Sequence, residues 1–197
     1  DAHAAAGEID FSAGSGEQRF SLTAPLRMLG QHQAANAAVA LAVALELRRQ
    51  GWLISTDAMR AGLAEATLPG RIEVIGRGPT VVLDVAHNPH AVATLAVNLD
   101  AMGFYPRTHA VFAAMADKDI AGMVRAIGHL VDAWYLCDLP LERAASADAV
   151  QRICQATMPG LHKGDTPCKV YPGPVQAVRA AFLQHGRLVE FCKPRRQ

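Results

Sequence analysis

The fold of this chain is decided by two neighbouring stretches, GRIE at residues 70–73 and LDVAHNPHA at residues 83–91. Three apolar residues, VVL at 81–83, lead directly to Asp84. An uninterrupted apolar run is typical of a strand that is covered on both faces. The dipeptide at 88–89, Asn-Pro, then favours a turn into a helix. This order predicts one unit of an open α/β sheet, in which ligands bind beyond the carboxyl ends of the strands.

Downstream of residue 71, short β-rich runs alternate with segments of helix length. We expect strands at residues 80–85, 109–113, 133–137, 169–171 and 188–191, with a further short strand at 74–75. The helices expected between them cover residues 90–102, 119–130, 146–157 and 174–184. Repeated β-α units of this length predict a Rossmann-like, doubly wound α/β fold with a mostly parallel sheet and helices on both faces.

The region before residue 69 does not show this alternation of strands and helices. Phe11 and the segment 19–22 flank a glycine-bearing turn at 14–16, a pattern that predicts an edge hairpin. Helices are expected after it at 32–49 and at 56–66.

Pro69-Gly70 ends the second of these helices, so we place a domain boundary near 68–71. The predicted domains are then 1–68 and 69–197. We expect the helices of the first domain to lack the sheet that they should cover, which would leave apolar surface exposed.

The composition narrows the classes of function. The chain has 197 residues, of which 51% are hydrophobic and 19% charged, with a formal net charge of +1. A general nucleic-acid-binding surface would need a basic excess on one face, and we expect no nucleic-acid partner. No apolar run approaches the roughly 20 residues of a membrane helix. The four cysteines form no C-x-x-C pair, which suits a reducing cytoplasm.

Asp84 and His87 are the first candidates for a binding site. A carboxylate at the end of the strand can accept hydrogen bonds from two ribose hydroxyls, and an imidazole three residues later can reach phosphates, helped by the positive end of the next helix. A structural interpretation is also open for each residue. Asp84 could tie the turn, His87 could be a turn residue, and the Asn-Pro dipeptide is common at helix starts.

Three segments, taken in order, extend this pattern: LGQHQAANAA at 29–38, LPGRIE at 68–73 with LDVAHNPHA at 83–91, and FAAMADKD at 112–119. Together they closely resemble the folylpolyglutamate synthase/dihydrofolate synthase family, which belongs to the Mur ligase superfamily of ATP-dependent amide-bond-forming enzymes. The resemblance implies a Mur ligase C-terminal domain preceded by the end of the central ATPase domain.

The resemblance also implies roles for four residues. Asn36 would contact the adenine of ATP and Asp84 would hold its ribose. Arg71 would bind ATP phosphate, where its permanently charged, planar guanidinium group could also neutralise charge in the transition state. His87 would lie close to the nucleotide and the reacting groups, which makes His87 and Arg71 the catalytic candidates. Structural alternatives are a helix-interior amide for Asn36 and a solvent-facing linker arginine for Arg71.

The implied reaction joins L-glutamate to dihydropteroate or folate. ATP would phosphorylate a substrate carboxylate, and the glutamate amino group would attack the acyl phosphate. The resemblance implies a monomeric, cytoplasmic enzyme that uses ATP and Mg²⁺. The phosphate loop is absent from these residues, and the implied metal ligands and modified lysine lie upstream of Asp1. We therefore expect this polypeptide alone to have no ligase activity.

Several alternatives stay open. Another Mur-type ligase could add an amino acid to a peptidoglycan precursor, although the LDVAHNPH pattern fits the folate branch better. A non-catalytic nucleotide-binding module is the third interpretation. Lys118 could attract substrate carboxylates or belong to a solvated loop, and Ser146 is expected to cap a helix. The tail CKPRRQ at 192–197 departs from the family pattern, which suggests a truncated or frame-shifted end.

Overall fold

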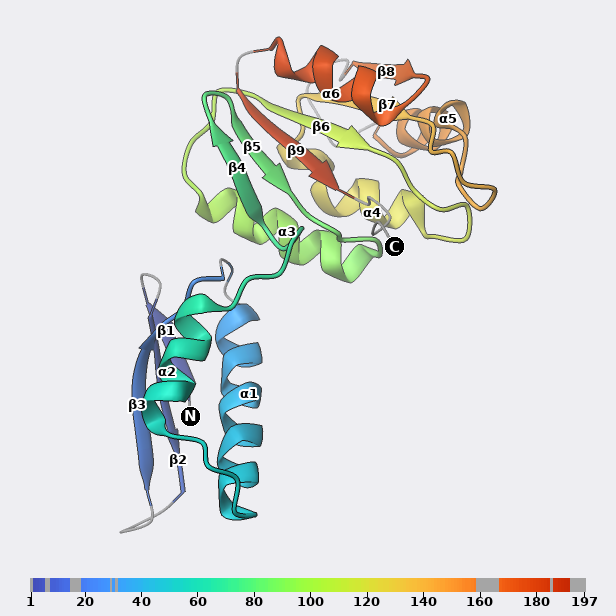
Figure 1. Cartoon of the computed structure of the whole chain (residues 1–197). Coiled ribbons are helices and arrows are strands. Elements are labelled where there is room, and N and C mark those ends of the chain that lie inside the picture. Colours follow the sequence, from blue (N-terminus) through green and yellow to red (C-terminus); the bar gives the residue numbers. More distant parts are fainter. Residues whose placement is uncertain are drawn as a thin grey trace. The chain divides into compact units, whose positions relative to one another are not determined.

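A computed structural model describes residues 2–5, 8–14, 19–28, 30, 32–158, 167–184 and 186–191. The chain divides into two compact units, Asp1–Arg71 and Ile72–Gln197 (Figure 1). The identity of the predicted domains at 1–68 and 69–197 stays a prediction. The divergent tail at 192–197 lies outside the described residues, as do residues 15 and 16 of the predicted hairpin turn.

The first unit is a three-stranded antiparallel sheet with two helices. Its strands, in the order β1-β2-β3, are β1 (Ala2–Ala5), β2 (Glu8–Ala13) and β3 (Phe20–Pro25), and its helices are α1 (His32–Arg49) and α2 (Thr56–Glu65). Strands β2 and β3 form the predicted hairpin. Along both strands every second side chain is buried, as the two-residue period of a strand covered on one face requires.

Our expectation that these helices lack a sheet is wrong. The apolar faces of β2 and β3 pack against α1 and α2 in one cluster, made of Ile9, Phe11, Leu22, Ala24, Ala37, Leu41, Met59 and Leu63. The sequence reading missed β1, an alanine-rich strand that pairs antiparallel with β2. Alanine has low β-propensity, so this segment carries no local strand signal.

The second unit contains a six-stranded sheet in the order β4-β5-β9-β6-β7-β8. Its strands are β4 (Glu73–Arg77), β5 (Thr80–Leu83), β6 (Thr108–Phe112), β7 (Ala133–Cys137), β8 (Cys168–Tyr171) and β9 (Arg187–Phe191). All neighbouring pairs are parallel except β4 with β5. The predicted α/β fold with a mostly parallel sheet is therefore confirmed.

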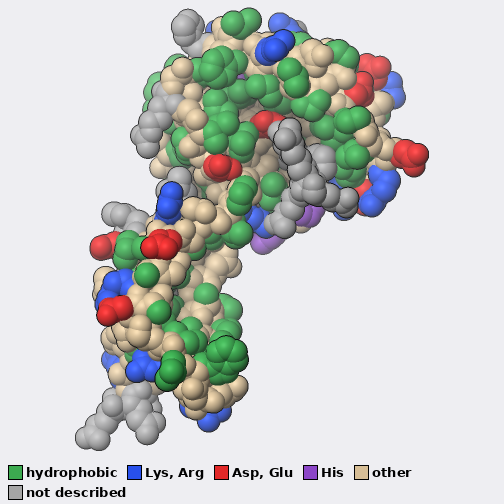
Figure 2. Space-filling model, in the orientation of Figure 1, with side chains coloured by type: hydrophobic (Ala, Val, Ile, Leu, Met, Phe, Trp, Pro, Cys, Tyr) green, Lys and Arg blue, Asp and Glu red, His purple; other side chains and the backbone are tan. Residues whose placement is uncertain are grey.

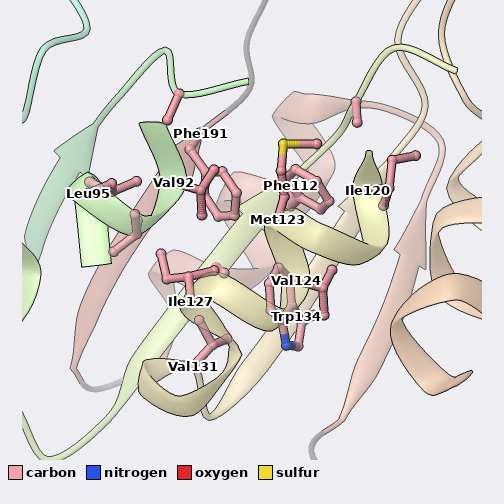
Figure 3. Close-up of a cluster of buried hydrophobic side chains, with 14 of the residues drawn as sticks. Val92, Leu95, Phe112, Ile120, Met123, Val124, Ile127, Val131, Trp134 and Phe191 are labelled. Carbon is pink, nitrogen blue, oxygen red and sulfur yellow. The ribbon is translucent and has the colours of Figure 1, made fainter. Parts of the chain in front are cut away.

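Helices cover both faces of this sheet (Figure 1). They are α3 (Pro89–Ala101), α4 (Ile120–Ile127), α5 (Ala147–Thr157) and α6 (Pro174–Phe182), and a short 3-10 turn, η2 (Gly128–Leu130), follows α4. Helices α3, α4 and α5 share the larger core with the sheet, whereas α6 packs on the other face. Figure 3 shows Phe112 and Phe191 side by side in the larger core, with Trp134 beside them; the Phe112 and Phe191 rings stack at 4.6 Å between centroids.

Side-chain caps explain where three of these helices begin. Asn88, Asp119 and Ser146 each accept a hydrogen bond from a backbone N–H three residues ahead. The expected capping role of Ser146 is confirmed. None of the helices in the described part of the chain has the length and apolar character that crossing a bilayer requires.

Candidate nucleotide site at the carboxyl edge of the sheet

Asp84 follows directly on β5 and is 7% exposed. Its backbone N–H donates to the Glu190 carbonyl at 2.9 Å and so continues the ladder between β5 and β9. Its carboxylate accepts backbone N–H groups on both oxygens, from Ala86 at 2.7 Å and from Ile72 at 2.9 Å. Asp84 therefore has a structural role, because its side chain ties the β5–α3 turn to the residue before β4.

Ile72, which binds Asp84, has an unusual backbone conformation. Its φ is +49°, and the neighbouring Gly70 also has a positive φ of +71°. A β-branched residue rarely adopts the left-handed region, so this conformation is strained. It is held because the Ile72 side chain is buried in the larger core and its N–H is bonded to Asp84. The strain lies directly after Arg71, one of the predicted catalytic residues.

His87 is exposed within the same turn. Its Nδ1 lies 2.9 Å from the Val85 carbonyl oxygen, which can only accept a hydrogen bond, so Nδ1 carries a proton. In the neutral ring, Nε2 is then the unprotonated nitrogen. This contact orients the imidazole and leaves Nε2 as the atom that can meet a ligand.

Two helix N-termini adjoin at this edge. Gly122, in the first turn of α4, lies so close to Pro89 of α3 that an added Cβ would stand 2.8 Å from the proline Cγ. The packing of the two helix starts therefore requires glycine at this position. Because β5 and β6 are parallel, the loops that lead into α3 and α4 both leave the carboxyl edge of the sheet.

Lys118 belongs to the loop after β6. Its ammonium group pairs with Asp117 at 3.1 Å, and Arg143 reaches the same carboxylate at 3.4 Å. The Ala116 N–H donates to the Arg143 carbonyl at 2.8 Å, which fixes the loop to the segment before α5. A paired lysine in a fixed loop matches the structural alternative for Lys118.

Arg71 and Asn36 belong to the first unit. Arg71 is its last residue and is exposed. Asn36 is on an exposed face of α1, and its Nδ2 donates to Oε1 of the buried Gln33 at 2.9 Å. This contact fixes the amide orientation and leaves the oxygen and one N–H of Asn36 to meet a partner. The structure thus brings Asp84 and His87 together in one turn of the second unit, with Arg71 and Asn36 in the other unit.

The described residues contain no group of three or more His, Cys, Asp or Glu side chains that could hold a metal ion. A cavity of about 380 Å³ opens elsewhere in the second unit, at the amino ends of β6 and β7. Arg107, His109, Asp132 and Lys169 are among the residues that line it. It lies at the opposite edge of the sheet from Asp84 and His87.

Comparison with known proteins defines the class. Residues 70–190 match the family model described as "Mur ligase, glutamate ligase domain". The chain therefore belongs to the Mur ligase family.

Within that family, the chain is similar to the folate enzymes, as the motifs predicted. It is 42% identical over 113 residues to dihydrofolate synthase/folylpolyglutamate synthase of Escherichia coli K12, covering 57% of this chain and 26% of that protein. It is 40% identical over 134 residues to a probable bifunctional folylpolyglutamate synthase/dihydropteroate synthase of Halobacterium salinarum, covering 68% of this chain and 16% of that protein.

Solved structures agree with this assignment. E. coli FolC in complex with DHPP and ADP has a TM-score of 0.80 and 31% identity, over 98% of this chain and 42% of that one. A bifunctional folylpolyglutamate synthase/dihydrofolate synthase with Mn, AMPPNP and L-glutamate bound has a TM-score of 0.72 and 30% identity, over 94% of this chain and 41% of that one. The chain thus spans less than half the length of the relatives that it matches.

The sequence reading missed the residues that hold the site in place. Ile72 and Ala86 supply the N–H groups that bind Asp84, and the Val85 carbonyl orients His87. Backbone donors and acceptors are present at every position, so no residue type marks them. Isoleucine at a positive φ even contradicts local propensity, and only burial and the Asp84 bond account for it.

Proposed function

We propose that this chain supplies part of the ATP site of an ATP-dependent ligase that adds L-glutamate to dihydropteroate, to folate or to both. The observation that carries the proposal is the family match over residues 70–190, which includes Asp84 and His87 at the carboxyl edge of the sheet. The described complexes of the relatives, with ADP and DHPP or with AMPPNP, Mn and L-glutamate, support the same substrates.

In the proposed reaction, ATP phosphorylates a substrate carboxylate and the amino group of glutamate displaces the phosphate. The residues of this chain contribute positioning and charge. Arg71 is exposed and permanently charged, so it would bind phosphate and neutralise charge that develops in the transition state. His87 would direct Nε2 to the phosphates, because Nδ1 is already bonded to Val85. These two residues are the proposed catalytic groups.

Asn36 would bind the adenine, since its remaining N–H and its oxygen offer the donor and acceptor that the base edge requires. Asp84 would bind the ribose hydroxyls through its carboxylate oxygens, which also accept the N–H groups of Ile72 and Ala86. We infer that Asp84 both fixes the turn and contacts the nucleotide. A divalent cation would assist phosphoryl transfer, and the described residues contain no cluster of His, Cys, Asp or Glu side chains that could hold it.

Calorimetric titration of Mg-ATP into the chain tests the nucleotide role. Because Asp84 also holds the turn, its substitution could act through the fold, and exposed residues make sharper tests. We expect H87A and R71A each to weaken binding about tenfold, equivalent to about 1.4 kcal/mol. The matched controls are H90A, an exposed histidine in the first turn of α3, and R48A on α1. Equal effects of test and control variants, or no binding by a chain with a native circular dichroism spectrum, would contradict the proposal.

The substrate is tested in a chimera in which this chain replaces the structurally matching part of E. coli FolC. We expect ADP release that depends on dihydropteroate or folate and on glutamate, and loss of that release in the chimera carrying H87A. The chain alone should release none. ADP release with nucleotide-linked muramyl peptides in place of folates would favour a peptidoglycan ligase. Nucleotide binding with no turnover by a folded chimera would favour a non-catalytic module.

A further inference from the structure

Two cysteine side chains meet between α5 and β8, away from the proposed nucleotide site. Cys154 lies in the last turn of α5 and is fully buried, whereas Cys168 begins β8 and is partly exposed. Their thiols hydrogen-bond to each other. Because Cys168 is at the amino end of its strand, the pair is at the opposite edge of the sheet from Asp84 and His87.

Three contacts hold the pair together. The side-chain amide of Gln151, one turn before Cys154, donates to the Cys168 carbonyl at 2.8 Å. Strand pairing places Cys168 opposite Trp134, and the Trp134 N–H donates to the Pro167 carbonyl at 2.8 Å. The Cys168 side chain also packs against the core cluster that contains Cys154. Both the backbone and the side chain of Cys168 are therefore fixed against α5.

The contact shifts the pKa values of the two thiols in opposite directions. The hydrogen bond from Cys154 lowers the pKa of the Cys168 thiol, because it stabilises the Cys168 thiolate. The same contact and then burial raise the pKa of Cys154. A partly exposed thiol with a lowered pKa beside a buried second thiol is the arrangement that oxidants attack selectively.

We propose that Cys154 and Cys168 form a reversible intramolecular disulfide when the protein meets a hydroperoxide. In the first step the Cys168 thiolate attacks the peroxide: an S–O bond forms, the O–O bond breaks, and the departing oxygen takes a proton to become water or an alcohol. The sulfur is oxidised to a sulfenic acid and the peroxide is reduced.

In the second step the sulfur of Cys154 attacks the sulfenic sulfur of Cys168. An S–S bond forms, the S–O bond breaks, and hydroxide leaves with the Cys154 proton as water. A dithiol reverses the reaction. The disulfide joins α5 to β8, which is an edge strand paired only with β7 among the described strands.

The test uses the full chain and hydrogen peroxide at an equimolar amount. We expect a product lighter by two hydrogens, in which peptide mapping finds Cys154 linked to Cys168 and which dithiothreitol reverses. C154S should stop at the sulfenic acid on Cys168, trapped as a dimedone adduct, and C168S should leave Cys154 unmodified. The proposal would be overturned if Cys154 and Cys168 both still reacted with an alkylating reagent after peroxide treatment. A disulfide that contains Cys137 or Cys192 and not the pair Cys154–Cys168 would also overturn it.

A second pair of variants tests whether the fixed geometry matters without touching the sulfurs. Q151A removes the bond to the Cys168 carbonyl, and Q155A removes an exposed glutamine from the same helix. We expect Q151A to trap more dimedone adduct and less disulfide than Q155A, with both variants native by circular dichroism. Equal ratios would overturn the role of Gln151 in aligning the pair.

Discussion

The two units of this chain differ in how much of the sheet their helices cover. In the second unit, helices cover both faces of a six-stranded sheet, and its two described clusters contain 23 and 9 buried apolar residues. In the first unit, two helices cover one face of a three-stranded sheet, and its described cluster contains 8. Since stability grows with the apolar area that folding buries, we expect the second unit to be much the more stable by itself.

Helix α1 is where this difference is most evident. Its inward face buries Gln33, Ala37 and Leu41, but its outward face carries Val39 at 65% and Val43 at 54% exposure. Apolar side chains reach the surface of this unit in the space-filling view (Figure 2). Asn36 precedes Val39 and Val43 by three and seven residues, so the proposed adenine contact lies on the same exposed stripe. A helix that is apolar on both faces has more surface to bury than its own sheet covers.

The largest expected effect is in the core of the second unit. Phe112 is fully buried and stacks on Phe191 at 4.6 Å, so F112A should lower the free energy of unfolding by about 3–5 kcal/mol. The matched control is F182A, because Phe182 on α6 is 49% exposed and its loss should cost far less. Urea denaturation followed by circular dichroism measures both. Similar losses in the two variants would contradict the idea that the core between sheet and helices carries the stability.

A second test compares the two faces of α1. Leu41 is 2% exposed and Val43, two residues later, is 54% exposed. We expect L41A to destabilise the first unit by about 2–5 kcal/mol and V43A to change it by no more than about 0.5 kcal/mol. Amide hydrogen exchange in α1 measures the stability of the first unit separately from that of the second. If V43A were as costly as L41A, the outward face would be buried in solution and the contrast between the units would be smaller.

The turn that holds Asp84 gives an intermediate effect. D84N keeps the size of the side chain but replaces one acceptor oxygen by a donor, which would face the N–H of Ile72 or Ala86. We expect a loss of about 1.5–3 kcal/mol in the stability of the second unit. The control is D138N, since Asp138 is exposed and its carboxylate accepts the Ala147 N–H at 2.8 Å. Equal losses in a urea titration would argue against a special structural role for Asp84.

The same contrast between the units explains what the sequence could predict. Helices with a clear cap and strands with an apolar run were found nearly at their observed bounds, because both signals are local. The order of the strands in the sheet could not be predicted from the sequence, because β9, the last strand in the chain, lies between β5 and β6. Strands β5, β6, β7 and β9 all bury residues on both faces, so the sequence pattern does not predict which of them pair.

The candidate site was predictable only in part. Residue type and position at the end of β5 pointed to Asp84 and His87, and the structure brings these two into one turn. The backbone partners that fix them depend on the fold, and the strained conformation of Ile72 opposes its own propensity. In the first unit the hairpin and both helices were predicted, but β1 was missed for a related reason, since this alanine-rich segment becomes a strand only through its pairing with β2.

The smallest effect lies at the exposed end of α1. Arg49 binds both carboxylate oxygens of Glu46, at 2.8 and 2.9 Å, and Gln50 donates to one of them at 2.9 Å. These hydrogen bonds, that of Arg49 first, lower the pKa of Glu46 from 4.5 to about 2. A lowered folded-state pKa contributes stability that is complete above the unfolded value and is lost as the pH falls toward about 2.

Because the pair is fully exposed, this contribution is small and is best measured as the pKa itself, by NMR titration of the Glu46 carboxyl carbon. R49Q should return that pKa toward its ordinary value, whereas R48Q, which removes the neighbouring cation at the same helix end, should leave it low. High salt should also raise it, since screening weakens exposed pairs. If R48Q raised the pKa as much as R49Q, the low pKa of Glu46 would be caused by the summed positive charge at the end of α1. The bidentate hydrogen bond from Arg49 would then not be its specific cause.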